Sequence, residues 1–261
     1  MTDAASVAVP TPHARSTSAG PPELAQVSAE VRPDAAWFWR VFLETDDLAD
    51  LTPAARRMLA VAAALFLRRG AVATSVRDVA RAAGVSPGAL YNHFDSKEDV
   101  LFTLVRFGND RLVRSLDAAD PGEGSPPRAR LAAFVTTWVT GHLGHQSLAQ
   151  LVRREYIHLT GERLAQVVAQ RRAVRDRLVG IVHAGVEDGT FHLPGDGTHD
   201  ATPVAVMVLD LCLAISDWYD PSRGPDARVL ADRYVTAALR LLGAEDRRGR
   251  LVLRTGGGRS G

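Results

Sequence analysis

The side chains best suited to binding chemistry gather in one stretch of the chain, residues 74–99. Two serines, Ser75 and Ser86, each stand at the start of a short helix-forming run. Backbone N–H groups are free at the start of a helix, and together with the helix dipole they favour a phosphate. Other side chains in this stretch can donate hydrogen bonds to phosphates or to base edges: Arg77, Tyr91, Asn92, His93 and Lys97. These residue types at this spacing indicate contact with a nucleic acid.

The first short helix would contact the DNA backbone through its opening turn. Ser75 serves as the N-cap and also as a phosphate contact, whereas Arg77 either reaches the backbone or is simply solvated. The second short helix opens with four small residues that allow close approach to base edges: Ser86, Pro87, Gly88 and Ala89. A thymine methyl group can pack against Pro87 or Ala89.

Larger polar side chains follow towards the end of the second short helix. Asn92 can pair bidentately with adenine, so we expect it to read a base. Tyr91 offers a phenolic hydroxyl to a phosphate, and His93 is expected to contact a phosphate or a base. Lys97 is the one lysine among the 31 basic residues, and it would clamp a phosphate at the start of the next helix.

Three consecutive helices must position these side chains, over 53–69, 75–82 and 86–93. Gly84 lies between the last two, where a residue without Cβ can take a positive φ and turn the chain sharply. Apolar residues on both sides of the turn would lock the two short helices at a fixed angle: Val79, Ala80, Val85 and Leu90. This pattern predicts a helix-turn-helix, whose second helix enters the major groove.

The sequence from Thr74 to Leu101 resembles the signature of the TetR/AcrR family of transcriptional regulators. Its most specific part is Leu90-Tyr91, His93-Phe94 and Ser96-Lys97-Glu98. The resemblance is strong over 52–112. It implies an all-α fold in which an N-terminal three-helix helix-turn-helix domain joins a larger helical domain for ligand binding and dimerisation. Many members carry lysine where this chain has Pro87. The proline removes one positive charge from the expected DNA contact at this position.

The resemblance also implies how such a protein works. A homodimer would bind double-stranded operator DNA of near-palindromic sequence, with its recognition helices roughly 34–36 Å apart in the bound state. A small-molecule effector would shift the helix that begins at Lys97 and so release a repressor from DNA. We expect the protein to use no cofactor and no metal, and to have no membrane partner.

Composition and pattern divide the 261 residues into five segments. We expect a disordered extension over 1–33, an extra amphipathic helix within 34–51, the DNA-binding domain over 52–112, the ligand-binding and dimerisation domain over 113–243, and a flexible tail over 244–261. The net charge of +1 excludes a uniformly basic protein that coats nucleic acid. Residues 52–112 nevertheless hold 9 basic and 5 acidic side chains, so a polyanion would bind there.

The second domain shows helical periodicity and no long strand pattern. The predicted helices span 127–144, 147–159, 161–189, 201–219 and 226–242. The longest unbroken apolar run, Met58–Leu67, has ten residues, whereas a membrane-spanning helix needs about 20. The N-terminus lacks the pattern of a secretory signal, so we expect a cytoplasmic protein.

Two helices of the second domain carry apolar stripes that suit either an intramolecular core or a dimer interface. One stripe consists of Val204, Met207, Val208, Leu211, Cys212 and Ile215. The other consists of Leu230, Tyr234, Val235, Ala238, Leu241 and Leu242. In TetR-like proteins the last two long helices pair across the two-fold axis, which favours the dimer.

A ligand chamber in the second domain is likewise implied by the resemblance, although core packing is the plainer role for each aromatic residue there. Its expected lining is Phe134, Trp138, Arg154, Tyr156, Met207 and Trp218. The run from Ile215 to Tyr219 looks like members that sense fatty-acyl or steroid-derived CoA thioesters, and nearby arginines suit CoA phosphates. The expected effector is therefore an acyl-CoA or another apolar small molecule.

Two other classes of protein remain open. A metal-dependent or ligand-binding helical protein without sequence-specific DNA binding could use His142 and His145, but no nearby carboxylate completes a metal site and such histidines are usually solvated. The sequence lacks G-x-S-x-G and a phosphate-binding loop ending in Gly-Lys, and its one cysteine excludes a disulfide framework, so we do not expect an enzyme. The third class is a helical adaptor whose helix-turn-helix has lost DNA binding.

Overall fold

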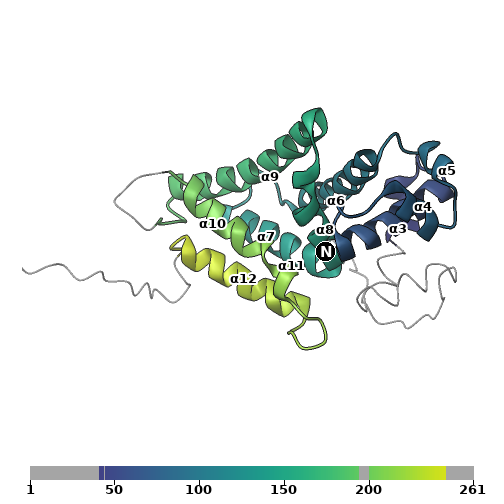
Figure 1. Cartoon of the computed structure of the whole chain (residues 1–261). Coiled ribbons are helices and arrows are strands. Elements are labelled where there is room, and N and C mark those ends of the chain that lie inside the picture. Colours follow the sequence, from purple (N-terminus) through teal and green to yellow (C-terminus); the bar gives the residue numbers. More distant parts are fainter. Residues whose placement is uncertain (1–40, 44, 194–199, 245–261) are drawn as a thin grey trace, which may run out of the picture.

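The computed structural model describes residues 41–43, 45–193 and 200–244, and every regular element within these ranges is a helix (Figure 1). The predicted all-α class is therefore confirmed. The α-helices are α3 (Pro53–Arg69), α4 (Val76–Ala82), α5 (Pro87–Tyr91), α6 (Lys97–Ala119), α7 (Pro127–Gly144), α8 (Gln146–Glu155), α9 (Gly161–Glu187), α10 (Thr202–Leu213), α11 (Ile215–Trp218) and α12 (Ala227–Leu241). Two 3-10 helices, η1 (Asp46–Leu48) and η2 (Tyr156–His158), complete the set.

The helices form two groups, and α6 runs through both. Helices α3, α4 and α5 lie together at one end of the molecule, while α7, α10 and α12 lie at the other (Figure 1). Each group has its own apolar core. The first core includes Leu59, Phe66, Leu90, Phe94 and Leu104, and the second includes Leu116, Leu131, Trp138, Leu178 and Val208. Since α6 supplies Leu104 to the first core and Leu116 to the second, a shift of α6 must be felt in both.

Side-chain caps set where the helices of the first group begin. Thr52 Oγ1 accepts from Ala55 N at 3.2 Å and stands before Pro53, a residue suited to the first position of a helix. Ser75 is the predicted N-cap and forms a capping box with Asp78, in which Ser75 Oγ accepts from Asp78 N and Asp78 Oδ2 accepts from Ser75 N. Local sequence alone therefore specifies these starting points.

Three helices are shorter than their sequence patterns predict. Helix α5 ends at Tyr91, with Asn92 as its C-cap, because the chain must then turn to bury Phe94. The pattern over 147–159 becomes α8 followed by η2. The pattern over 201–219 breaks at Ala214, and Gln146 Nε2 donates at 2.8 Å to the carbonyls of Ser216 and Tyr219 at the end of α11. Tertiary hydrogen bonds of this kind leave no local signal.

The segment before α3 packs on the body of the molecule where the structure describes it. Val41 and Phe42 are buried, and the Phe42 ring lies 5.2 Å from that of Phe107 on α6. Arg56 Nη1 donates to the carbonyl of Thr45 at 3.1 Å. The predictions for residues 1–33, for residues 34–40 of the extra helix and for the tail beyond residue 244 lie outside the described residues.

Candidate DNA-binding surface and effector cavity

The turn between α4 and α5 holds the two short helices at a fixed angle. Gly84 takes a φ of 69°, a left-handed conformation that favours glycine. Val85 N then donates to the carbonyl of Ala80 at 2.9 Å, which closes the turn. Val79 and Leu90 are buried on the inner sides of the two helices. The apolar wedge predicted from the sequence is therefore present, and α5 is presented to solvent.

The candidate DNA contacts lie on the outer side of this unit. Eight of the ten predicted residues are exposed: Ser75, Arg77, Ser86, Pro87, Gly88, Tyr91, Asn92 and His93. The remaining two, Ala89 and Lys97, are partly buried. Tyr91 is 52% exposed although its ring is large and apolar. The first turn of α5 is built of small residues, so its backbone can approach a flat surface closely.

The polar residues at and after the end of α5 differ in their structural roles. Asn92 caps α5, and His93 follows it in the turn that leads to α6. Lys97 Nζ donates to the carbonyls of Ala71 and Val72, at 2.7 Å and 3.2 Å, and thereby fixes the loop between α3 and α4. An ammonium group has three donors, so one remains for a phosphate. Lys97 therefore stabilises this loop in the free protein, in addition to its predicted contact with DNA.

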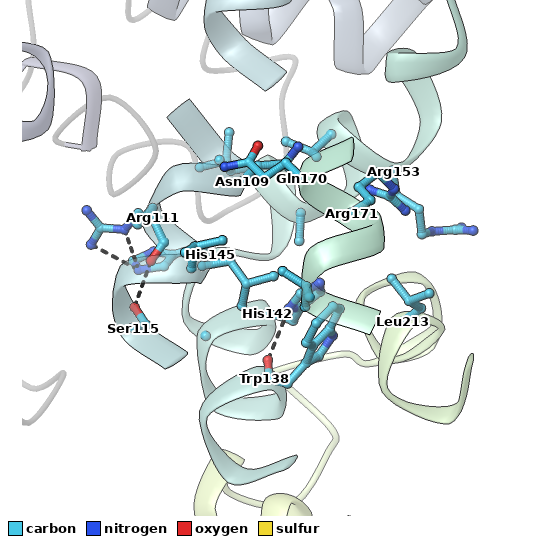
Figure 2. Close-up of a pocket in the computed structure, with 18 of the residues that line it drawn as sticks. Asn109, Arg111, Ser115, Trp138, His142, His145, Arg153, Gln170, Arg171 and Leu213 are labelled. Atoms are coloured by element: carbon cyan, nitrogen blue, oxygen red, sulfur yellow. Dashed lines mark hydrogen bonds between the residues drawn. The ribbon is translucent and has the colours of Figure 1, made fainter. Parts of the chain in front are cut away.

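A cavity of about 120 Å³ lies in the second group of helices, between α6, α7, α8, α9 and α10 (Figure 2). Apolar side chains form much of its wall, among them Leu112, Leu148, Val174 and Leu213. Its polar lining includes Asn109, Arg111, Trp138, His142, His145, Arg153, Gln170 and Arg171. A concave apolar wall with a few convergent polar groups is typical of a small-molecule site.

Two histidines of the cavity are neutral at pH 7. Burial lowers the pKa of His142 to about 4, and burial together with Arg111 lowers the pKa of His145 to about 4. His142 Nδ1 lies 3.0 Å from the carbonyl of Trp138, so Nδ1 carries the proton and Nε2 is an acceptor. The expectation that these histidines are solvated is wrong, because both line the cavity.

Three arginines surround the cavity with different partners. Arg111 donates from Nε to His145 Nε2 at 3.2 Å and pairs with Asp47 at 3.1 Å. Arg153 pairs with Asp217 on α11. The Arg171 guanidinium carbon lies 4.4 Å from the ring centroid of Tyr156, a cation–π contact. The cavity therefore presents positive charge next to apolar surface.

The cavity coincides only in part with the residues expected to line it. Trp138 lies in its wall. Phe134 stacks behind Trp138 with ring centroids 5.6 Å apart, and Tyr156 lies behind Arg171. The other three expected residues lie towards solvent: Arg154 pairs with Asp217, and Met207 and Trp218 are 53% and 56% exposed. Their assignment to the ligand stays a prediction.

Sequence reasoning missed several polar lining residues, among them Asn109, Arg111 and Gln170. Asn109 had a usable signal, because it occupies a helical-period position between the apolar residues Val105 and Leu112. A buried amide in an apolar stripe calls for a specific partner. Gln170 lies on a helix of mixed polarity, where the pattern does not single it out.

The described part of the chain offers no cluster of three or more His, Cys, Asp or Glu side chains that could hold a metal ion. Cys212 is buried, and burial raises the pKa of its thiol to about 12. Among the described helices none has the length and apolar character required to cross a membrane.

Comparisons with known proteins agree with both halves of this arrangement. Residues 58–104 match the family model "Bacterial regulatory proteins, tetR family", and residues 124–242 match "Tetracyclin repressor-like, C-terminal domain". The HTH-type transcriptional repressor KstR2 of Rhodococcus jostii (strain RHA1) is 31% identical over 196 residues, which cover 74% of this chain and 93% of that protein.

Solved structures extend the likeness to the whole fold. A regulatory protein of the tetR family from Rhodococcus RHA1 matches with a TM-score of 0.69 and 31% identity, covering 75% of this chain and 100% of that chain. AibR in complex with isovaleryl coenzyme A and operator DNA matches with a TM-score of 0.62 and 25% identity, covering 74% of this chain and 100% of that chain.

The chain belongs to the TetR family of DNA-binding transcriptional regulators. The resemblance seen in the sequence from Thr74 to Leu101 is thereby confirmed. This family consists of regulators of transcription and not of enzymes.

Proposed function

We propose that this regulator is a repressor that binds a near-palindromic operator as a homodimer and leaves it when a small molecule occupies the cavity. The observation that carries the proposal is the position of α6. Lys97, at its N-terminus, holds the loop beside the helix-turn-helix, while Asn109 and Arg111, further along, line the cavity. The relative KstR2 of Rhodococcus jostii is named a repressor, which supports repression over activation. We place the protein in the cytoplasm, where the DNA is.

Exposed apolar side chains on α10, α11 and α12 support a homodimer. Met207, Leu211, Trp218 and Val229 are between 45% and 56% exposed. Isolated exposed apolar residues are common, but four on neighbouring helices suit an interface. Because a two-fold dimer presents two recognition helices, its DNA site would repeat with inverted symmetry.

The effector we propose is an acyl-CoA or another apolar small molecule. AibR, which this chain resembles over 74% of its length, binds isovaleryl coenzyme A and operator DNA. The apolar wall and the arginines around the cavity suit an acyl group with a charged attachment. Arg111, Arg153 and Arg171 would take the polar part.

Release would follow from a shift of α6 against the helix-turn-helix. Gly108 brings α6 so close to α8 that an added Cβ would meet Val152 Cγ2 at 2.5 Å, so α6 and α8 must move together. Glu155, at the end of α8, accepts from Ala71 N at 2.7 Å in the loop before α4. Effector binding that moves α6 and α8 would therefore change the spacing of the two recognition helices. By linkage, operator DNA must weaken effector binding by the same factor.

The proposal can be tested by selecting duplexes from a random library on the purified protein without effector. The expected result is one enriched motif with two inverted half-sites, whose centres are separated by about one helical turn or a multiple of it. Enrichment of a single half-site would contradict the dimer. No enrichment over a protein with Tyr91→Ala and Asn92→Ala would favour the second candidate, a ligand-binding helical protein without sequence-specific DNA binding.

A further inference from the structure

Two donors in the cavity wall have no acceptor within the described part of the protein. They are Nδ2 of Asn109 and Nε1 of Trp138, on residues that are only 7% and 5% exposed. Leaving a buried donor unpaired costs about 1–3 kcal/mol, so such groups are usually satisfied. The two residues lie on opposite sides of the cavity (Figure 2). Because both residues belong to the cavity lining, a molecule inside the cavity is the candidate source of both missing acceptors.

The charged groups around the cavity also indicate a bound ligand. No Asp or Glu belongs to its lining. Arg111 and Arg153 have carboxylate partners outside the cavity, Asp47 and Asp217. For Arg171 the described residues offer no carboxylate within ion-pair distance, and its guanidinium group packs on the Tyr156 ring. A guanidinium that is partly desolvated and unpaired favours a carboxylate or phosphate oxygen.

The size of the cavity limits the apolar part of the ligand. Its volume is about 120 Å³, close to the roughly 150 Å³ of an engineered apolar cavity that holds one benzene molecule. A branched five-carbon acyl group or a single ring would fill it. A longer nucleotide part, if present, would have to leave the cavity past the arginines.

We propose that the cavity binds a compact apolar group that carries hydrogen-bond acceptors and one oxyanion. Asn109 and Trp138 donate to the acceptors, and Arg171 pairs with the negative charge. This assignment deepens the proposed function, on which it rests for the identification of the cavity as the effector site. The oxyanion is either a carboxylate on the apolar group itself or a phosphate attached to it through a thioester.

Calorimetry with three probes that share one apolar body tests the chemistry. Isovalerate carries a carboxylate, isovaleryl-CoA carries a thioester carbonyl and phosphates, and isovaleramide carries acceptors without charge. At least one of the two anions should bind about 10-fold or more tightly than the amide, since ion-assisted hydrogen bonds are the stronger ones. Whichever anion binds identifies the source of the charge. Equal binding of all three, or binding of none, overturns the proposal.

Variants with matched controls assign the roles. Trp138→Phe keeps the ring and removes only the N–H, and should weaken the bound anion about 3- to 10-fold, the range for one neutral hydrogen bond. Ile157→Val, at an exposed apolar residue outside the cavity, should change nothing. Arg171→Gln should abolish the preference for an anion over the amide, whereas Arg175→Gln, on the same helix but outside the cavity and paired with Asp176, should keep it. Unchanged affinity in Trp138→Phe and Arg171→Gln would overturn the assignment.

The empty protein offers a test that needs no ligand. Asn109→Leu removes an unpaired buried amide, so its Tm should rise. Gln150→Leu is the matched control, because that buried amide donates to the carbonyl of Ser216 and its loss should lower the Tm. A Tm that does not rise in Asn109→Leu means that the amide is already satisfied within the protein and overturns its role.

DNA binding, measured separately on the same preparations, distinguishes this inference from the proposed function. Specific DNA binding without binding of either anionic probe would refute the inference alone. Anion binding sensitive to Trp138→Phe and Arg171→Gln, without specific DNA binding, would refute the proposed function and leave the inference standing.

Discussion

At the scale of single residues, the two binding regions differ in where their donors lie. On α4 and α5 the polar groups are exposed, as Ser75, Asn92 and His93 are. In the cavity they are buried, as Asn109 and Trp138 are. Exposed donors suit a polyanion that brings its own wide surface, whereas buried donors suit a small molecule that is enclosed. This difference supports the proposal that the two sites take two kinds of partner.

Asn92 offers the sharpest test of base reading. Asn92→Ala should relax the preference at one base position of the operator, because a bidentate contact contributes about 1–3 kcal/mol of discrimination. Tyr91→Ala should instead weaken binding to all sequences by a similar factor, since it removes a phosphate contact. Anisotropy titrations on operators changed one base pair at a time measure both. Equal loss on every operator in Asn92→Ala would remove its base-reading role.

The buried histidines make stability depend on pH. His142 and His145 have pKa values of about 4 in the folded protein and 6.5 ordinarily. As pH falls from 6.5 towards 4, the unfolded chain binds protons that the folded chain does not. The free energy of unfolding should therefore decrease, by up to about 1.4 kcal/mol per pH unit for each histidine.

Urea unfolding at pH 7.5 and pH 5.5 measures this dependence. His142→Gln should lose less stability between the two pH values than the unchanged protein does. His183→Gln is the control, because His183 is exposed on α9 beside Glu187, and it should keep the full dependence. An identical pH dependence in all three proteins would show that His142 does not titrate as its burial requires.

At the scale of helices, α6 and α8 are the elements that would connect the cavity to the DNA-binding unit in the proposed mechanism. Helix α6 joins both cores, and Glu98 near its N-terminus accepts from Thr160 N at 2.6 Å, just before α9. Arg163 on α9 adds an ion pair of 2.9 Å with Asp99. Helix α9 is thus fastened to the N-terminal end of α6, next to the unit that presents α5. A movement of α6, α8 or α9 at the cavity would therefore reach the proposed DNA-binding surface through these direct contacts.

The contact of α6 with α8 depends on Gly108. Gly108→Ala should destabilise the protein by about 1–3 kcal/mol, because the new methyl group meets Val152 at 2.5 Å in a packed region. Gly180→Ala on α9 has open space around the new Cβ and should stabilise the protein by about 0.5–1 kcal/mol through helix propensity. Chemical denaturation compares the two. A Gly108→Ala protein at least as stable as Gly180→Ala would mean that the helices separate freely.

Helix positions were predictable where the signal is local. Thr52, Ser75, Ser86 and Ser96 each cap a helix at the expected place, because a side-chain oxygen and the adjacent residues suffice for that. The break at Ala214 was not predictable, since contacts from a distant helix, α8, hold α11. The cavity lining was predictable only at Trp138, because lining depends on which helices meet and not on residue type.

At the scale of the whole molecule, the proposed dimer would set the spacing of the recognition helices. The exposed apolar residues Met207, Leu211 and Val229 lie on α10 and α12. These two helices lie at the end of the molecule away from α4 and α5 (Figure 1). Pairing there would leave both DNA-binding units free to face one duplex.

Leu211→Glu is expected to disrupt that pairing, because a charge in the middle of an apolar interface is left unpaired. Sedimentation should give the mass of a dimer for the unchanged protein and that of a monomer for the variant, with weaker binding to a two-half-site operator. Ile157→Glu, which changes another exposed apolar residue on η2, is the control and should remain dimeric. A dimeric Leu211→Glu protein would place the interface elsewhere.

The central claim is sequence-specific DNA binding by the surface on α4 and α5. We would titrate the purified chain by fluorescence anisotropy against labelled DNA from its own promoter region, with scrambled DNA as competitor, at two salt concentrations. The account predicts tight binding that the scrambled competitor does not displace, and affinity that falls as salt rises, since phosphate contacts release counterions. Binding to duplexes containing the selected operator no tighter than to scrambled DNA, at both salt concentrations, would contradict it.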